Sequence, residues 1–351
     1  MANCHEIFLV FNEKKVKLTD AKRKTLVEKR TVIETKILKG LNEDHSEYTF
    51  DFRGQGSFAM DTIINPSSTE EKYDVDYGLF LVSEDPIPEK FPKPATLHTW
   101  VYDIVDGHTN DVQNKDTCIR VTYQSDNEDV PSYHVDIPIY WQQKGNTPFL
   151  AHSKDGWIES DPQAFTDWFN KKADADEQLR RVTRYLKWWS RGLDKKAPKG
   201  LAISIWAANS FVSCPDRDDE SLQKTVKRIH DTLDGNFQCL RPTTPIGEDL
   251  TKNYPHKDYF VDKLKELYSI GQNALSKEDI EESANLWAEI FGDAFPSQQA
   301  SKIEEAKAVN IAMKNKQLFT SASGKVEMTP TQSSHNIPPT RFWGYDKTQE
   351  L

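Results

Sequence analysis

The pattern of apolar and polar positions changes near residue 160 and divides the chain into two parts. Before that point, four short segments read as strands: 48–52, 74–82, 117–123 and 132–140. In the first and the last of them apolar and polar residues alternate, which is the period of a half-buried strand. After it, apolar residues recur at helical spacing. The helices expected there cover 161–170, 175–193, 221–235, 257–275 and 276–292, with another after Pro296. The expected fold class is α+β, with a mixed-sheet lobe followed by a helical lobe.

Two helices are also expected in the first part. Residues 19–41 read as an amphipathic helix in which Thr19 is the N-cap, with one apolar face formed by Leu26, Ile33, Ile37 and Leu41. Residues 95–107 have apolar positions at the same spacing, and the four prolines within 84–94 predict a loop before them. In the helical part, Asp161 and Ser276 are the expected N-caps of the helices that follow them.

These elements suggest three regions along the chain. We expect a catalytic lobe over residues 1–158, in which the helix at 19–41 could pack across both lobes. A helical lobe would cover 159–298, and a further helix with a polar tail would cover 299–351.

Composition limits the kinds of partner that we expect the protein to bind and the cellular compartment in which we expect it. The 45 Lys and Arg against 55 Asp and Glu give a net charge of −10, whereas proteins that grip duplex nucleic acid usually carry a basic surplus. No apolar run is long enough for a membrane span, and the start of the chain does not resemble a signal peptide. Four scattered cysteines disfavour a zinc site and a disulfide framework. We therefore expect a cytoplasmic protein without membrane or duplex nucleic-acid partners.

Three carboxylates carry the candidate chemistry. Asp74 and Asp76 are two positions apart on a predicted strand, so they share one face of the sheet. Asp136 lies on another predicted strand and completes the cluster if the two strands are neighbours. Two Mg²⁺ ions held by such oxygen ligands support phosphoryl transfer, because one activates the attacking oxygen and the other stabilises the leaving pyrophosphate.

A glycine-containing turn precedes this pair. In the segment Gln55-Gly56-Ser57, the glycine lets the backbone approach a triphosphate closely, and the exposed N–H groups and the serine hydroxyl can hold phosphate oxygens. Each motif alone has an ordinary explanation: a solvent-facing pair of acids, a simple turn, or a surface aspartate on a strand. Their order, spacing and placement on strands agree with one another, which favours a nucleotide site.

The residues GQGSFAMDT, YDVDYGLFL and YHVDIPIY together resemble the core signature of polymerase β-like nucleotidyltransferases. Within that superfamily, CIRV, DPQAFTDWFN and LRRVTRYLKWWSR make the chain most similar to the bacterial cGAS/DncV-like nucleotidyltransferases (CD-NTases), in particular the DncV-type cyclic dinucleotide synthases. The resemblance runs across roughly residues 50–205 and more loosely to about 295. It implies a two-lobed enzyme with the active site in the cleft between the lobes.

The family's activity is what the resemblance implies for this chain. Such enzymes make cyclic di- or trinucleotide second messengers from ATP, GTP or other nucleoside triphosphates with release of pyrophosphate, using two Mg²⁺ ions for which Mn²⁺ can substitute. In bacteria the product acts in anti-phage (CBASS) signalling by switching on an effector protein. Whether a partner protein activates the enzyme stays open.

The resemblance also assigns roles to individual residues. Asp74, Asp76 and Asp136 match the catalytic metal triad, and Gly56 and Ser57 match the phosphate-binding turn. Five more positions match nucleotide contacts of the family: Gln55, Arg120, Lys187, Ser204 and Asp249. For the family's serine after the linker, Ala202 is the alternative to Ser204.

Two other functions compete with a cyclic-nucleotide synthase. A nucleotidyltransferase of this fold could modify a protein, an RNA end or a small molecule. A non-catalytic nucleotide-binding scaffold could also keep the fold, although the intact set of three aspartates speaks against it. The basic run of Lys195, Lys196 and Lys199 is interpreted as a flexible linker rather than as part of the site.

Overall fold

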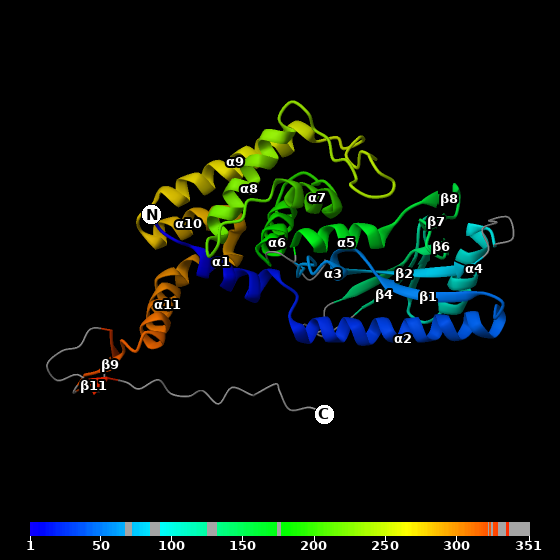
Figure 1. The fold of residues 1–351 in the computed structure, drawn as a ribbon, viewed down its shortest axis with the longest axis horizontal. Helices are drawn as coiled ribbons and strands as arrows, with labels where there is room; N and C mark the ends of the chain where they lie inside the picture. The colour runs from blue at the N-terminus through cyan, green and yellow to red at the C-terminus, as the bar shows by residue number, and fades with distance from the viewer. Residues whose placement is uncertain are drawn as a thin grey trace.

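A twisted mixed sheet forms one lobe of the molecule and a bundle of helices forms the other (Figure 1). The structure is a computed structural model, and it describes residues 1–66, 72–84, 92–124, 132–173, 177–321, 323, 326–328 and 335–336. The strands of the sheet are β1 (Thr49–Gly54), β2 (Tyr73–Ser83), β3 (Asp111–Asn114), β4 (Ile119–Tyr123), β5 (Tyr133–Ile137), β6 (Ile139–Gln143), β7 (Phe149–His152) and β8 (Gly156–Glu159).

The order of strands puts β2 at the centre of the sheet. The order is β3-β4-β5-β2-β6-β7-β8, and β1 pairs with β2 as a further strand. β2 runs parallel to β5 along its first half and parallel to β6 along its second half, whereas the other pairs are antiparallel. The sequence predicted one strand over 132–140, but Pro138 divides it into β5 and β6, since proline has no backbone N–H to donate.

The described helices include those predicted between residues 19 and 292, and others that the pattern did not predict, such as 5–11 and 200–210. They are α1 (His5–Phe11), the π-helix η1 (Asn12–Val16), α2 (Asp20–Asp44), α3 (Gly56–Ala59), α4 (Pro94–Val105), α5 (Pro162–Ala173), α6 (Glu177–Arg191), α7 (Gly200–Ser210), α8 (Asp218–Leu233), α9 (Lys257–Ser276), α10 (Ile280–Phe291) and α11 (Ala300–Lys314), with short 3₁₀ turns η3 (Gly292–Ala294) and η4 (Ser297–Gln299). Of the predicted loop at 84–94, residues 85–91 lie outside the described residues, and α4 already begins at Pro94.

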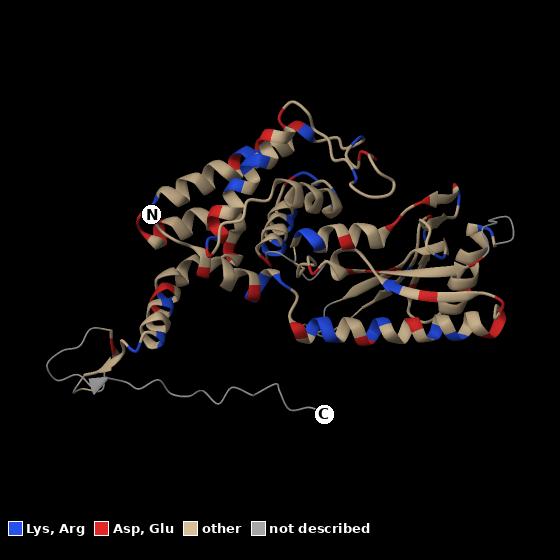
Figure 2. Cartoon of the chain, in the orientation of Figure 1, with Lys and Arg blue, Asp and Glu red and all other residues tan. Residues whose placement is uncertain are grey.

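α2 covers one face of the sheet along its length (Figure 1). Its N-cap is Thr19, whose side chain accepts a hydrogen bond from the Lys22 N–H, and the four residues predicted for its apolar face are all buried: Leu26, Ile33, Ile37 and Leu41. They pack in one core with the strands and α4, and the helix does not join the helical core. Figure 2 shows acidic and basic residues interspersed along the length of α2.

The start of the chain packs in the helical lobe rather than in the sheet lobe. Phe8 and Phe11 of the first helix are fully buried, and their rings contact those of Tyr185, Phe291 and Phe295. The helical core therefore contains residues from both the N-terminal segment and the second half of the chain. The lobe boundaries expected from the sequence stay a prediction, and this segment crosses them.

Two predicted N-caps have different outcomes. The Asp161 carboxylate accepts a hydrogen bond from the Ala164 N–H at the start of α5, at 2.8 Å, as predicted. The prediction that Ser276 caps the next helix is wrong. That residue ends α9, and Asp279 caps α10 by accepting from the N–H groups of Glu281 and Glu282.

The C-terminal region leaves the helical lobe through α11 (Figure 1). Beyond it, β9 (Phe319–Thr320) pairs with β10 (Val326–Glu327) and β11 (His335–Asn336). Most of the predicted polar tail lies outside the described residues. Among the described helices, none is both long enough and apolar enough to cross a membrane.

Candidate active site

The strand register brings the predicted acidic residues to one face of the sheet. Asp76 on β2 lies opposite Asp136 on β5, and Asp74 lies opposite His134 one step along the same pair of strands. Arg120 on β4 lies opposite Asp136 from the other side. Because residues two apart on a strand share a face, these five side chains form one polar patch on neighbouring strands.

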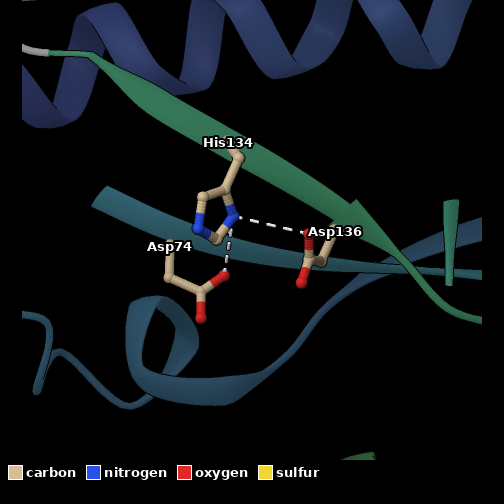
Figure 3. A group of neighbouring side chains, drawn as sticks. All are labelled: Asp74, His134 and Asp136. Atoms are coloured by element: carbon tan, nitrogen blue, oxygen red, sulfur yellow. Dashed lines mark ion pairs between the residues drawn. The ribbon is translucent and has the colours of Figure 1, made fainter. Parts of the chain in front are cut away.

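His134 lies between two of the carboxylates (Figure 3). Its Nδ1 is 3.2 Å from Asp74 Oδ1 and 3.4 Å from Asp136 Oδ1. Among the described residues, these three side chains make a group whose ligand atoms lie within 4.8 Å of one another, close enough to share an ion. Asp76 lies beside this group rather than within it.

The electrostatics of this patch reflect crowded negative charge. Burial, reinforced by the charges of Asp74 and Asp136, raises the pKa of Asp76 to about 8. Burial alone would lower the pKa of His134, but its contacts with Asp136 and Asp74 outweigh burial and raise that pKa to about 9. The imidazole is therefore positively charged at neutral pH and partly balances the carboxylates.

Asp136 is the most strongly held of the acids. Burial would raise its pKa, but the contacts with His134 and the guanidinium of Arg120 outweigh burial and lower the pKa to about 2. Arg120 donates from Nε to Oδ1 and from Nη2 to Oδ2, both at 2.5 Å. In this structure Arg120 therefore binds Asp136 and does not line the cavity described next.

The Gly56-Ser57 turn lies directly against the carboxylates. Gly56 begins α3 with φ +66°, and a Cβ at this position would come within 2.1 Å of Asp76 Oδ2. Only glycine combines this backbone conformation with such a close approach. The backbone of Gln55 continues the contact, since its N–H donates to the carbonyl of Asp76 at 3.3 Å.

A cavity of about 600 Å³ opens between the sheet lobe and the helical lobe beside this turn. We call it the interlobe cavity. The predicted site residues that line it are Gln55, Gly56, Ser57, Asp74, Asp76, Lys187 and Ser204. They come from β2, from α3 and from its N-cap Gln55 on one side, and from α6 and α7 on the other, so the chain folds segments distant in sequence around one hollow.

Lys187 reaches the cavity from the buried face of α6. Its ammonium group donates to the Thr62 carbonyl at 3.1 Å and to the Thr62 hydroxyl at 3.0 Å. Burial, with the nearby charges of Arg191 and Arg184, lowers its pKa to about 7. Among the described residues, the hydrogen bonds of Lys187 go to Thr62 and not to a carboxylate. An anionic ligand can therefore supply the negative partner of its ammonium group.

Three other predicted contacts differ in their placement. Ser204 lines the cavity and Ala202 does not, although the Ser204 hydroxyl donates to the Gly200 carbonyl within its own helix. Gln55 donates from Nε2 to the Tyr140 hydroxyl at 3.3 Å, and its buried Oε1 has no hydrogen-bond partner among the described residues. Asp249 lies outside the interlobe cavity, where its carboxylate accepts from the Cys239 and Thr251 N–H groups.

Four basic residues line the cavity that the sequence analysis did not assign to it. They are Arg191, Lys195, Lys196 and Arg241. Lys195 and Lys196 belong to the run interpreted as a flexible linker, and no motif marks them. Lys195 and Lys196 lie between α6 and α7, and each of these helices carries a predicted nucleotide contact. That position in the sequence could have indicated that they line the cavity.

The residues present fit a divalent metal ion. Three carboxylates of the patch supply the hard oxygen ligands that Mg²⁺ prefers. Burial is the main cause of the raised pKa of Asp76, and repulsion by Asp74 and Asp136 adds to it. A cation bound there would relieve this repulsion. Asp74, Asp76 and Asp136 are the residues that would hold it.

Comparison with known proteins finds a family model that matches part of this chain. A family model for the nucleotidyltransferase domain of proteins like the cyclic GMP-AMP synthase DncV matches residues 50–140, which include both β2 and β5. This segment of the chain resembles a DncV-like nucleotidyltransferase domain, as its motifs suggested.

Individual relatives are distant in sequence but similar in fold. The chain is 25% identical over 256 residues to a cyclic GMP-AMP synthase of Escherichia albertii, a match that covers 69% of this chain and 55% of that enzyme. It is 23% identical over 357 aligned residues to a cyclic GMP-AMP synthase of Vibrio cholerae, covering 84% and 79%. The structure of V. cholerae DncV with the linear intermediate 5′-pppA(3′,5′)pG superposes with a TM-score of 0.68 at 19% identity, covering 85% of this chain and 99% of that one.

Proposed function

We propose that this chain joins nucleoside triphosphates, with ATP and GTP as the expected substrates, into a cyclic di- or trinucleotide and releases pyrophosphate. The observation that carries the proposal is the contact between the Gly56 turn and Asp76, because it places a phosphate-binding turn directly against a carboxylate cluster at one cavity. The relatives described as cyclic GMP-AMP and cyclic AMP-AMP-AMP synthases support the cyclic nature of the product.

The residues of the site have different roles in this proposal. The N–H groups and hydroxyl of the Gly56-Ser57 turn bind phosphate oxygens of the donor triphosphate, and Lys187 approaches the same phosphates from α6. Bound Mg²⁺, held by Asp74, Asp76 and Asp136, would supply charge neutralisation for the transferred phosphoryl group. The acceptor hydroxyl oxygen forms a bond to the α-phosphorus while the bond from that phosphorus to the pyrophosphate oxygen breaks.

The hydroxyl proton must leave as that bond forms. Asp136 is poorly suited to accept this proton, because its carboxylate is held by Arg120 and has a pKa lowered to about 2, which makes it a weak base. Asp74 is more exposed and is free of such a clamp, with 56% of its side chain accessible. The proton passes to Asp74 or to water beside it in this proposal.

The biological setting is part of the proposal and rests on the family resemblance alone. A cyclic product would act on a downstream effector, and anti-phage signalling is the role that the resemblance implies. Mg²⁺ as the metal rests on the carboxylate ligands of the site.

Product analysis tests the proposal directly. The chain is incubated with all four nucleoside triphosphates and Mg²⁺, treated with phosphatase, and the surviving nucleotides are identified by mass spectrometry. We expect a phosphatase-resistant cyclic species, lost in Asp74→Asn and retained in Asp116→Asn, an exposed aspartate that pairs with Lys154 outside the cavity. A cyclic product from Asp74→Asn would contradict the metal assignment, and label transferred only to a protein, RNA or small molecule would favour the competing function.

A further inference from the structure

Residues 57–63 form a short closed loop at the wall of the interlobe cavity, and we call it the 57–63 loop. The Ser57 carbonyl closes it by accepting hydrogen bonds from the N–H groups of Thr62 at 2.9 Å and of Ile63 at 3.1 Å. Thr62 also accepts both hydrogen bonds that the Lys187 ammonium group donates. The two side chains proposed to bind the donor triphosphate, Ser57 and Lys187, are therefore both attached to this one loop.

Asp61 lies in this loop but outside the cavity. Its φ is +52°, a left-handed conformation that aspartate adopts more readily than most residues other than glycine. Thr62, the next residue, lines the interlobe cavity, whereas Asp61 does not. Any effect of Asp61 on a ligand in the cavity must therefore pass through the loop.

Arg23 of α2 holds the loop from the side of the sheet lobe. Its Nη1 donates to Asp61 Oδ1 and its Nη2 donates to the Phe58 carbonyl, each at 3.0 Å. The guanidinium carbon also lies 4.2 Å from the centre of the Phe58 ring. Because the donors of a guanidinium form a rigid planar fork, these contacts fix the loop relative to α2.

Arg184 of α6 holds the same aspartate from the side of the helical lobe. Its Nη1 donates to the Asp61 carbonyl at 2.6 Å and lies 3.6 Å from Asp61 Oδ2, and only 3% of the side chain is exposed. Its Nε donates to Oδ1 of the buried Asn12 at 3.0 Å, which orients the guanidinium. Residues three apart on a helix are neighbours on its surface, so the face of α6 that contacts Asp61 also carries Lys187.

We propose that Asp61 is a positioning residue for the donor triphosphate. Through Arg23 and Arg184 it ties the 57–63 loop to both lobes. This tie fixes the distance between Ser57 and Lys187, and groups that are already in place lose less entropy when they bind a ligand. The inference rests on the proposed function in taking the triphosphate to lie between these two groups.

Equilibrium binding of ATP against AMP and of GTP against GMP, with Ca²⁺ in place of Mg²⁺ to suppress turnover, tests this role. The monophosphate keeps the base and sugar, so the ratio of the two affinities isolates the contacts to the outer phosphates. Asp61→Gly removes the carboxylate and permits the positive φ. We expect it to lower the ratio about 10-fold. Asp216→Gly is the matched control and should leave the ratio unchanged, because Asp216 has a φ of +54° and a side chain that is 96% exposed.

A double-mutant cycle with Lys187 distinguishes positioning from a purely structural loss. Lys187→Met should also lower the ratio, and in that background Asp61→Gly should lower it further by only about 3-fold or less, because the group that it positions is gone. Arg23→Gln should reproduce the loss seen in Asp61→Gly, and Lys24→Gln, an exposed neighbour on α2, should not. Urea denaturation establishes that each variant is folded, and Arg23→Gln decides the matter if Asp61→Gly is not.

Three results would overturn the inference. They are an unchanged ratio in a folded Asp61→Gly, an equal loss in Asp216→Gly, and fully additive losses from Asp61→Gly and Lys187→Met. An intact chain that binds triphosphate and monophosphate equally would instead contradict the proposed function. Because turnover is not measured, a chain that binds in the expected pattern yet makes no cyclic product would also contradict the proposed function and leave this inference standing.

Discussion

Gly56 and Asp76 approach each other so closely that a methyl group on the glycine would lie 2.1 Å from the carboxylate oxygen. The contact couples the Gly56-Ser57 turn, which we propose binds phosphate, to β2, whose carboxylates we propose bind the metal. It also means that the site tolerates no side chain at this position.

Gly56→Ala should abolish nucleotide turnover. The substitution combines a φ of +66° with the clash against Asp76, whereas Gly145→Ala has a φ of +81° and an open space around its Cβ. Both variants should lose roughly 1 kcal/mol or more of folding free energy from backbone strain. Urea denaturation measures that shared loss, and product formation should fail only in Gly56→Ala; similar activity in the two variants would contradict the coupling.

Asp76→Asn should separate metal binding from stability. The neutral amide removes a buried carboxylate whose pKa is raised by burial and by Asp74 and Asp136, so the metal-free variant should unfold at a temperature no lower than the unmodified chain. Mg²⁺ should raise the unfolding temperature of the unmodified chain by mass action and leave Asp76→Asn nearly unchanged. Equal stabilisation of both by Mg²⁺ would show that Asp76 is not a ligand.

Lys187 should make stability depend on pH in a defined direction. Its pKa is lowered from 10.5 to about 7 by burial, so the unfolded chain holds more protons between these values and the stability of the folded chain rises with pH across that window. Below pH 7 Lys187 is charged in the folded chain, and the full free-energy penalty of burying that charge lowers the stability. Lys187→Met should therefore stabilise the nucleotide-free protein by roughly 2 kcal/mol at pH 6.5, with a gain that shrinks toward pH 10.

The same substitution should weaken triphosphate binding, because the apolar side chain offers no charge to the phosphates. Lys171→Met, an exposed lysine on α5, is the matched control for both measurements. Chemical denaturation across pH and nucleotide titration measure the two effects. If the difference in stability between Lys187→Met and the unmodified chain did not change with pH, the lowered pKa of Lys187 would be contradicted.

The linker lysines should affect substrate affinity more than fold. Lys195 and Lys196 line the interlobe cavity, whereas Lys199 of the same linker does not. Lys195→Gln together with Lys196→Gln should raise KM for the triphosphates about 10-fold, because two cations near the phosphates are lost. Lys199→Gln should leave KM unchanged, and an equal rise in both variants would indicate a general charge effect instead.

The parts of this molecule that sequence predicted well are those set by local periodicity. The buried face of α2 follows from apolar spacing alone. The prediction that Asp76 and Asp136 lie together required their strands to be neighbours, and the observed pairing of β2 with β5 meets that condition. Both depend on side-chain alternation, which is a property of the backbone.

The parts that escaped prediction depend on tertiary contacts. Nothing in the local sequence tells that Lys195 meets the cavity, that His134 lies between two carboxylates, or that Arg120 clamps Asp136. The capping of α10 by Asp279 rather than Ser276 shows a different limit, since two capping residues three positions apart compete and the geometry of the preceding turn decides.

The burial of Phe8 and Phe11 in the helical core has a consequence for how the chain folds as it is synthesised. The Tyr185 hydroxyl that donates to the Phe8 carbonyl lies 177 positions later in the sequence, and the aromatic partners in α10 come later still. The apolar residues of α1 must therefore stay unpacked until nearly the whole second lobe has been made. Closing the helical lobe is a long-range event that should be the slow and aggregation-sensitive step in producing this protein.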